Sequence, residues 1–426
     1  MPSLGYPVTR DFPGQVFAPA AFTGAIIALV FLVIINAASA GYETVSEFNA
    51  DFNVTRTHWF NQHLPFLVPK PGTLCDPRLL GLGDTITTNY TLFQYTIASI
   101  DLPNIDGSGL SYRGWTLDNC DITSLFVNAD ANTFVMDFTA LVSCRADEAQ
   151  ILTGNDYQIT ARTDWQESTL SGKYTSLLGA QKALKDRQGG TFNKTKDARG
   201  TVLDAITAVA STDFAIRVLN LDAVTSFPSI ISFQADFPWC PASLADAPCA
   251  SQIPPYTAGQ APQQYFASQP AASFNQPLVT DNTSAIISNL VQGIYATVRM
   301  DLGNRSPNNF LLNTSRIPEA INATFPSTFP NVANRSLLYS LLVDDGYYAS
   351  TPGTSSVYDL TGLLPLTLPG PAVLDGVYLC RFLVARSPGA AFIAVVAATL
   401  SVFSSGWAAF LAVAAAVVKR RSPGGK

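Results

Sequence analysis

Two long runs without a charged residue, near opposite ends of the chain, constrain its structure more than any other feature. They cover positions 12–42 and 387–418, which are 31 and 32 residues in succession. A helix needs about 20 apolar residues to cross the hydrocarbon core of a bilayer. Both runs exceed that length, so the sequence predicts transmembrane helices at residues 20–40 and 388–418.

Basic residues beside the second run predict its orientation. Four cations follow it: Lys419, Arg420, Arg421 and Lys426. Because basic residues accumulate on the cytoplasmic side of membrane helices, residues 419–426 are predicted to form a basic cytoplasmic tail. A retained first helix places residues 1–19 on the same side as a second cytoplasmic tail. Residues 41–387 are then an ectodomain outside the cytoplasm.

The first run permits a second interpretation. Ala38, Ser39 and Ala40 have the small-x-small form of a signal-peptidase site. Cleavage is disfavoured because the run exceeds the roughly 7–15 apolar residues of a signal core, and because the leader contains four prolines. We therefore expect a retained signal anchor. Either interpretation places residue 41 outside the cytoplasm.

Cysteines and glycosylation motifs are confined to residues 41–387. An even set of cysteines in this position suits an oxidising compartment and predicts three disulfides, formed by Cys75, Cys120, Cys144, Cys240, Cys249 and Cys380. Asn-x-Ser/Thr motifs predict N-glycosylation at eight positions: Asn53, Asn89, Asn193, Asn282, Asn304, Asn313, Asn322 and Asn334. Both signals agree with an ectodomain.

The balance of charge excludes nucleic acid as a partner. The chain has 25 basic and 31 acidic residues, and the ectodomain alone has 20 and 30, a net charge of about −10. Binding to nucleic acid requires a basic surface. An acidic exterior favours cationic partners and disfavours anionic substrates such as nucleotides.

Strand-like and helical patterns both occur in the ectodomain, which predicts an α+β fold. β-Branched and aromatic residues at 120–127 and 134–144 flank a polar segment, as in a hairpin that brings Cys120 near Cys144. Further strands are predicted at 90–97, 157–165 and 230–237. Helical spacing occurs at 174–184, 202–209 and 286–298.

One segment predicts a division of the ectodomain. Residues 238–280 contain eight prolines and no Lys or Arg, so they cannot form a long helix or an interior strand. We expect a boundary between two subdomains there.

Residues with catalytic or metal-binding chemistry are sparse. The only histidines, His58 and His63, are five positions apart and fall on different faces of a helix or strand, so no metal pair is expected. Asp344 and Asp345 stand beside two tyrosines and could belong to a glycosidase site, but Asp-Gly is also an ordinary turn, which we favour. The polar segment 299–310 is interpreted as a helix exit and a glycosylated loop. No catalytic residue, cofactor or metal site is predicted.

The second apolar run contains a stripe of small residues at a spacing of four: Ala397, Ser401, Ser405 and Ala409. Such a stripe lets another helix approach closely in lipid. The lipid bilayer is the predicted partner of both runs. Association of the stripe with the first run, or with a second copy of the chain, stays open.

Several short segments carry a resemblance to a known family: Gly41-Tyr-Glu-Thr-Val45, Arg299-Met-Asp-Leu-Gly303 with Asn308-Asn309, Tyr378-Leu-Cys380 and Ser404-Ser-Gly-Trp407. Together they resemble uncharacterised transmembrane proteins of mushroom-forming (basidiomycete) fungi, over most of the chain. The resemblance implies a membrane protein and implies no activity or functional residue. By topology alone the chain is also similar to class B scavenger receptors and to ATP-gated or acid-gated trimeric channels, and topology does not establish homology.

These features favour a membrane-anchored glycoprotein, at the plasma membrane or in a secretory-pathway membrane, whose ectodomain binds, senses or scaffolds. Two alternatives stay open. One is a membrane-tethered hydrolase that acts on polysaccharide through paired carboxylates. The other is an oligomeric channel lined by the serine-containing face of the second span.

Overall fold

The computed structural model describes most of the chain. The described residues are 17–62, 70–90, 92–101, 109–130, 135–145, 158–167, 198–214, 230–242, 257–260, 281–325, 334–343, 360, 363–368 and 370–421. They fold into two compact units. The first unit comprises Met1–Pro77 and Val377–Lys426, and the second comprises Arg78–Gly376.

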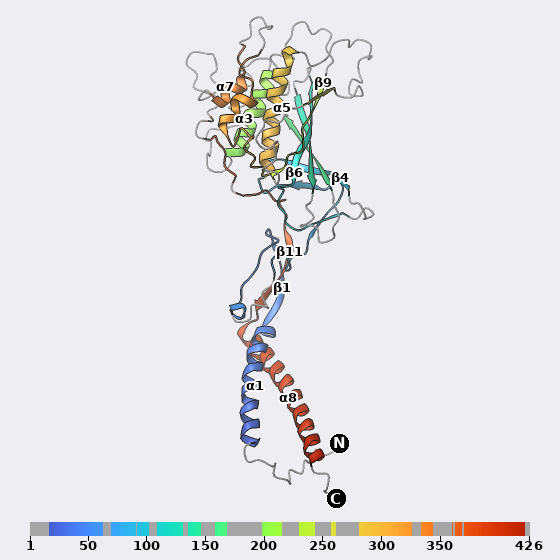
Figure 1. Cartoon of the computed structure of the whole chain (residues 1–426), viewed down its shortest axis with the longest axis vertical. Coiled ribbons are helices and arrows are strands. Elements are labelled where there is room, and N and C mark those ends of the chain that lie inside the picture. Colours follow the sequence, from blue (N-terminus) through green and yellow to red (C-terminus); the bar gives the residue numbers. More distant parts are fainter. Residues whose placement is uncertain are drawn as a thin grey trace. The chain divides into compact units, whose positions relative to one another are not determined.

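A seven-stranded antiparallel sheet forms the centre of the second unit (Figure 1). Its strand order is β10-β9-β6-β7-β8-β4-β3, and every pair of neighbours is antiparallel. The strands are β3 (Thr85–Thr87), β4 (Gln94–Asp101), β6 (Cys120–Asp130), β7 (Val135–Arg145), β8 (Gln158–Glu167), β9 (Ile230–Asp236) and β10 (Thr257–Gln260). A separate small sheet pairs β2 (Arg78–Leu80) with β5 (Leu110–Tyr112).

Buried apolar side chains follow the alternation of the strand on both β6 and β7, two neighbouring strands inside the sheet. A β-bulge between Ile122 and Ser124 shifts the alternation of β6 by one residue. Leu125 and Val127 are therefore buried like Ile122, although the spacing is odd. On β7 the buried residues alternate regularly: Phe138, Ala140 and Val142.

Three helices cover one face of this sheet (Figure 1). They are α3 (Ala198–Phe214), α5 (Asp281–Asp301) and α7 (Leu337–Val343). α5 packs on β6, and α3 packs on both α5 and α7. Gly293 allows the close approach of α3, because a Cβ atom there would lie 2.8 Å from Cγ2 of Ile206. α5 is consequently buried at every residue from Asn289 to its end.

Two apolar helices and a two-stranded ribbon make up the core of the first unit. They are α1 (Phe17–Ser39), β1 (Tyr42–Asn49), β11 (Tyr378–Ala385) and α8 (Pro388–Arg421). β1 and β11 are antiparallel, with Tyr42 opposite Ala385 and Asn49 opposite Tyr378. α1 ends three residues before Tyr42 and α8 begins three residues after Ala385, so both helices start from the same end of the ribbon (Figure 1).

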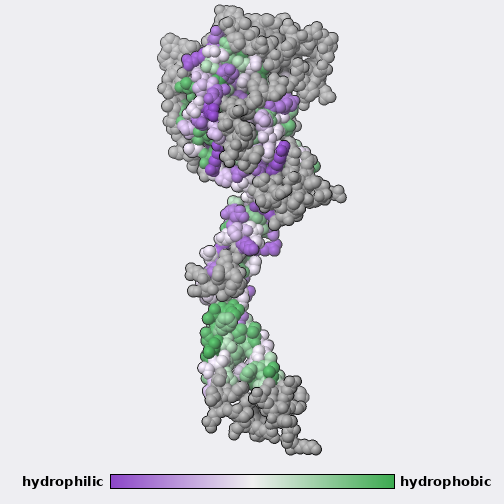
Figure 2. Space-filling view, in the orientation of Figure 1, coloured by the Kyte–Doolittle hydropathy of each residue, from purple (hydrophilic) through white to green (hydrophobic). Residues whose placement is uncertain are grey.

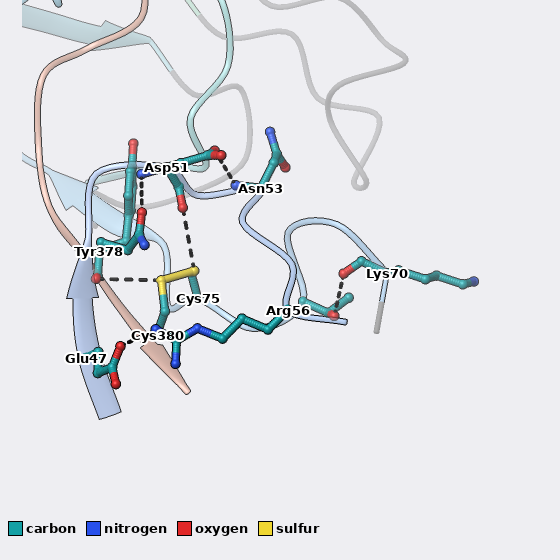
Figure 3. The surroundings of a disulfide bond; sticks show 10 residues. Glu47, Asp51, Asn53, Arg56, Lys70, Cys75, Tyr378 and Cys380 are labelled. Carbon is teal, nitrogen blue, oxygen red and sulfur yellow. Dashed lines mark hydrogen bonds and ion pairs between the residues drawn. A yellow bond between two sulfur atoms is a disulfide. The ribbon is translucent and has the colours of Figure 1, made fainter. Parts of the chain in front are cut away.

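A disulfide between Cys75 and Cys380 ties the ribbon to the segment that follows β1 (Figure 3). The two cysteines are 305 positions apart in the sequence. Around them, Arg56 pairs with Glu47 of β1 and lies 3.9 Å above the ring of Phe382 of β11. One face of the ribbon is thus covered by its own chain.

Most predicted elements of the ectodomain are confirmed. The hairpin is β6 and β7, with Cys120 opposite Cys144 and disulfide-bonded to it. The other predicted strands correspond to β4, β8 and β9, and two predicted helices correspond to α3 and α5. The predicted helix at 174–184 lies outside the described residues. So does Cys249, whereas Cys240 is disulfide-bonded.

The subdomain boundary expected at 238–280 stays a prediction, and the described part of that segment includes the edge strand β10. One feature differs from the sequence-based expectation. The pairing of β1 with β11 was not expected, because neither strand shows strict alternation of polar and apolar residues.

Gly303→Ala is expected to destabilise the second unit more than Gly83→Ala. Both glycines have a positive φ, 72° and 81°, so either substitution costs about 1–2 kcal/mol in the backbone. A Cβ on Gly303 would lie only 2.4 Å from the backbone nitrogen of Ala372, whereas nothing lies within 4 Å of Gly83. Thermal unfolding of the full chain in detergent should show the larger loss for Gly303→Ala; equal losses would contradict this close approach.

Candidate functional site

A buried arginine near the end of α5 organises one polar cluster of the second unit. Arg299 is 1% exposed, and its Nε donates to Oδ1 of Asp121 at 3.1 Å. Its Nη1 donates to Oδ1 of Asn308 at 2.7 Å, and its Nη2 donates to the carbonyl of Cys240 at 2.9 Å. The ring of Tyr295, one turn earlier, lies 5.1 Å from the guanidinium carbon. The arginine therefore connects α5 to β6, to the segment after β9 and to the loop after α5.

The partner carboxylate, Asp121 on β6, is also completely buried. Besides Arg299, its Oδ1 accepts from the backbone N–H of Ile122 at 2.9 Å, and its Oδ2 accepts from that of Cys240 at 3.0 Å. Burial raises the pKa of Asp121 from 3.8 to about 6, and the Arg299 charge and the backbone donors lower this pKa by less. The adjacent Cys120–Cys144 disulfide fixes the start of β6, and with it the position of this carboxylate.

A second buried carboxylate, Asp301, connects the end of α5 to the edge of the sheet formed by β4 and β3. Its Oδ1 accepts from the hydroxyl of Thr88 at 2.8 Å and from the N–H of Leu92 at 3.1 Å. Its Oδ2 accepts from the hydroxyl of Tyr95 on β4 at 2.7 Å. Burial raises the pKa of Asp301, and these hydrogen bonds lower it. The pKa of Tyr95 is raised by burial and then by Asp301.

A third cluster joins the three helices. Asp213 at the end of α3 accepts the N–H groups of Leu337 and Leu338 at 3.2 and 3.1 Å, which caps the first turn of α7. The hydroxyl of Ser336 donates to Asp213 at 3.1 Å and accepts from Nδ2 of Asn289 on α5 at 3.1 Å. Each helix is thereby fixed to the next by hydrogen bonds in the interior.

These clusters have the properties of structural connections. Asp121, Asp213 and Asp301 are at most 1% exposed, and both oxygens of each carboxylate accept hydrogen bonds. A general acid or base must come within hydrogen-bond distance of a substrate proton, which such carboxylates cannot do. Within the described ranges, no group of three His, Cys, Asp or Glu side chains is arranged to hold a metal ion.

The structure corrects the interpretation of segment 299–310. α5 ends at Asp301, as expected of a helix exit, but the residues that follow do not form a surface loop. Asn304, Asn308 and Asn309 are at most 5% exposed, and Nδ2 of Asn309 donates to the carbonyl of Ala296 on α5 at 2.8 Å. Asparagine side chains here form hydrogen bonds with backbone groups, which in an exposed loop would bind water instead.

Of the other residues considered as chemical candidates, the structure describes His58 alone. His58 is half-buried and stacks on Phe60, with ring centroids 5.2 Å apart. His63, Asp344 and Asp345 lie outside the described residues. Sequence reasoning missed Asp121 and Asp213 as interior residues, because a single aspartate beside apolar residues gives no periodic signal.

The predicted glycosylation sites differ in accessibility. Four asparagines are exposed and Asn313 is half-buried; the exposed ones are Asn53, Asn89, Asn322 and Asn334. Asn304 is 1% exposed, and its Nδ2, the atom to which a glycan would be attached, donates to the carbonyl of Cys240 at 3.4 Å. The folded chain leaves no room for a glycan on Asn304. Asn193 and the side chain of Asn282 lie outside the described residues.

α1 and α8 carry the main apolar surface of the first unit (Figure 2). Both are long and apolar enough to cross a membrane, and only 6% of each apolar window is buried. The two helices contact each other through a polar pair, in which Nδ2 of Asn36 donates to Oγ1 of Thr399 at 3.1 Å. The stripe on α8 does not take part in this contact, since its members are exposed: Ala397, Ser401, Ser405 and Ala409.

No protein-family model, curated protein or solved structure matches this chain.

Arg299→Met is expected to destabilise the second unit by about 3–5 kcal/mol, because it leaves the Asp121 carboxylate buried without its counter-charge. Arg316→Met offers a matched control: its ion pair with Glu319 is on the surface, where such pairs contribute about 0–1 kcal/mol. Chemical denaturation of the full chain in detergent measures both. Similar losses for the two variants would show that the Arg299 ion pair is unimportant.

The raised pKa of Asp121 predicts a pH dependence of stability with a defined sign. The folded state holds the proton up to about pH 6 and the unfolded state only up to about pH 3.8, so this carboxyl stabilises the fold fully below pH 3.8. That contribution, about 3 kcal/mol at the usual conversion of pKa to free energy, is lost as the pH rises to 6. Between pH 4 and pH 7 the unfolding free energy of the wild type should therefore fall by roughly this amount more than that of Asp121→Asn. Parallel curves would contradict it.

Proposed function

We propose that the protein is a two-span membrane glycoprotein whose ectodomain, residues 41–387, lies outside the cytoplasm and acts by binding, sensing or scaffolding. The membrane is the plasma membrane or one of the secretory pathway. The observation that carries this proposal is the antiparallel pairing of β1 with β11, which brings the ends of two exposed apolar helices together.

The pairing supports two spans because it fixes the direction of both helices. Tyr42 and Ala385 are opposite each other, three residues from the ends of α1 and α8. Two helices of this length that leave one point enter the same bilayer side by side and end on the same side of it. The basic residues after α8 then place both chain ends in the cytoplasm.

Contacts of α1 support its retention as an anchor. A cleaved signal would be lost from the mature protein, and with it the hydrogen bond between Asn36 and Thr399, which are 8% and 4% exposed. A polar pair inside lipid favours helix association, because the alternative is an unsatisfied polar group in hydrocarbon. The backbone N–H of Arg386, just before α8, also donates to the carbonyl of Gly41 at 3.1 Å.

A binding or structural role is supported by the buried polar residues of the second unit, which form hydrogen bonds between its elements. Arg299, Asp121 and Asp301 all serve to hold α5 on the sheet. Helices held in this way present a fixed surface, and the net charge of about −10 over residues 41–387 favours cationic partners for the ectodomain. Self-association through the exposed stripe of α8, and membership of the fungal family, are further proposals that rest on sequence alone.

Topology is tested on full-length chain expressed in eukaryotic cells with a tag at each end. We expect both tags to stay on one protein that resists extraction by alkaline carbonate. In intact cells, external protease should degrade an ectodomain at the cell surface and leave both tags intact. In sealed vesicles of the secretory pathway, it should remove both tags and leave the ectodomain as one protected fragment. Loss of the N-terminal tag from mature protein would show that α1 is a cleaved signal.

Glycosylation has an internal control in the chain itself. Enzymatic removal of N-glycans in heavy-oxygen water converts each modified asparagine to labelled aspartate, which peptide mass spectrometry detects. We expect label at exposed sites such as Asn334 and none at Asn304, which is 1% exposed. A chain without any labelled site would overturn the extracytoplasmic placement; label at Asn304 would contradict only the packing around Arg299.

A further inference from the structure

A group of aromatic side chains lies directly beside the end of α1. The ring of Tyr42 is 5.1 Å from that of His58 and 5.4 Å from that of Phe60, both edge-on. Phe60 belongs to the short helix η1 (Trp59–Gln62), and its ring lies 5.7 Å from that of Trp59. η1 is therefore held against the residue at which the ribbon begins.

The members of this group differ sharply in exposure. Phe60 is 3% exposed and fixes η1 to Tyr42, whereas the indole of Trp59 is 48% exposed. The next residue, Asn61, is 8% exposed, and among the described residues neither its Oδ1 nor its Nδ2 has a hydrogen-bond partner. η1 thus combines a large exposed aromatic ring with a buried amide. The exposed ring is the part of η1 that can contact surroundings outside the chain.

The level of this group along the first unit is set by α1. Tyr42 follows the last residue of α1, Ser39, by three positions, and its partner Ala385 precedes Pro388 of α8 by three. If the apolar helices cross the bilayer, the rings that contact Tyr42 lie at the height of the lipid headgroups. Tryptophan and tyrosine gather at that height because their rings are apolar and their N–H or O–H groups are polar.

We infer that η1 is a membrane-interface anchor, in which Trp59 inserts into the headgroup layer of the bilayer that α1 and α8 cross. The inference rests on the proposed two-span topology and adds a third point of contact with lipid, on the segment between β1 and Cys75. Charges near the group balance, as in the pairs Glu43–Arg386 and Glu47–Arg56, so the contact requires no anionic lipid. The occupant of this surface is a zwitterionic headgroup layer.

Tryptophan fluorescence in lipid nanodiscs tests the inference on the full chain. Nanodiscs of phosphatidylcholine carry a nitroxide quencher either on the headgroup or in the middle of the acyl chain. The contribution of Trp59 is the difference between wild type and Trp59→Phe, and that of Trp407, in α8, is the difference between wild type and Trp407→Phe. Correct folding of each variant is checked by the absence of free thiols.

We expect the Trp59 emission to lose most of its intensity to the headgroup quencher and little to the acyl-chain quencher. Trp407 should be quenched from the acyl chains. If Trp407 is quenched and Trp59 is not, the interface anchor is wrong and the two-span topology stands. If Trp407 also escapes both quenchers, the membrane topology itself is wrong.

Discussion

The antiparallel pairing of β1 with β11 is the constraint on which the rest of the first unit depends. An isolated two-stranded ribbon is only marginally stable in water. Here the ribbon is reinforced on one face by the Cys75–Cys380 disulfide and by Arg56, which lies over Phe382 and pairs with Glu47. Because the strands are antiparallel, the helices attached to them start from the same end of the ribbon. Inside the apolar segments, the hydrogen bond between Asn36 and Thr399 also joins the two helices.

In the second unit, α5 connects the other elements to one another. This helix has no exposed face over most of its length. A helix that is buried all round is usually apolar all round. α5 instead carries Asn289, Arg299 and Asp301, and each of them binds a different element. Buried polar groups cost free energy unless they are satisfied, so they tolerate few alternative packings. Asp121 is an example, because burial raises its pKa more than the adjacent guanidinium of Arg299 lowers it.

The sequence predicts the parts of this fold whose signals are local. β6 and β7 were recognisable because β-branched and aromatic residues flank a polar turn, and α5 because Ile286, Leu290 and Ile294 share one face. Pairing across more than 300 residues has no local signal, and β1 with β11 could not be foreseen. The same holds for the buried clusters. A run of Asn, Arg and Ser after a helix has the composition of a surface loop, and only the position of Asp121 and Cys240 shows that it is interior.

The second unit is an insertion in the connection between β1 and β11, and its first and last residues lie close together. Arg78 Nη1 at its first residue donates to the carbonyl of Asp375, next to its last, at 3.1 Å. A domain whose ends meet can be inserted into a loop without strain on either partner. The Cys75–Cys380 disulfide lies just before the first and just after the last residue of this unit in the sequence, so it joins the two connecting stretches covalently. Each unit is compact in itself, and the chain passes between the units at Pro77–Arg78 and at Gly376–Val377.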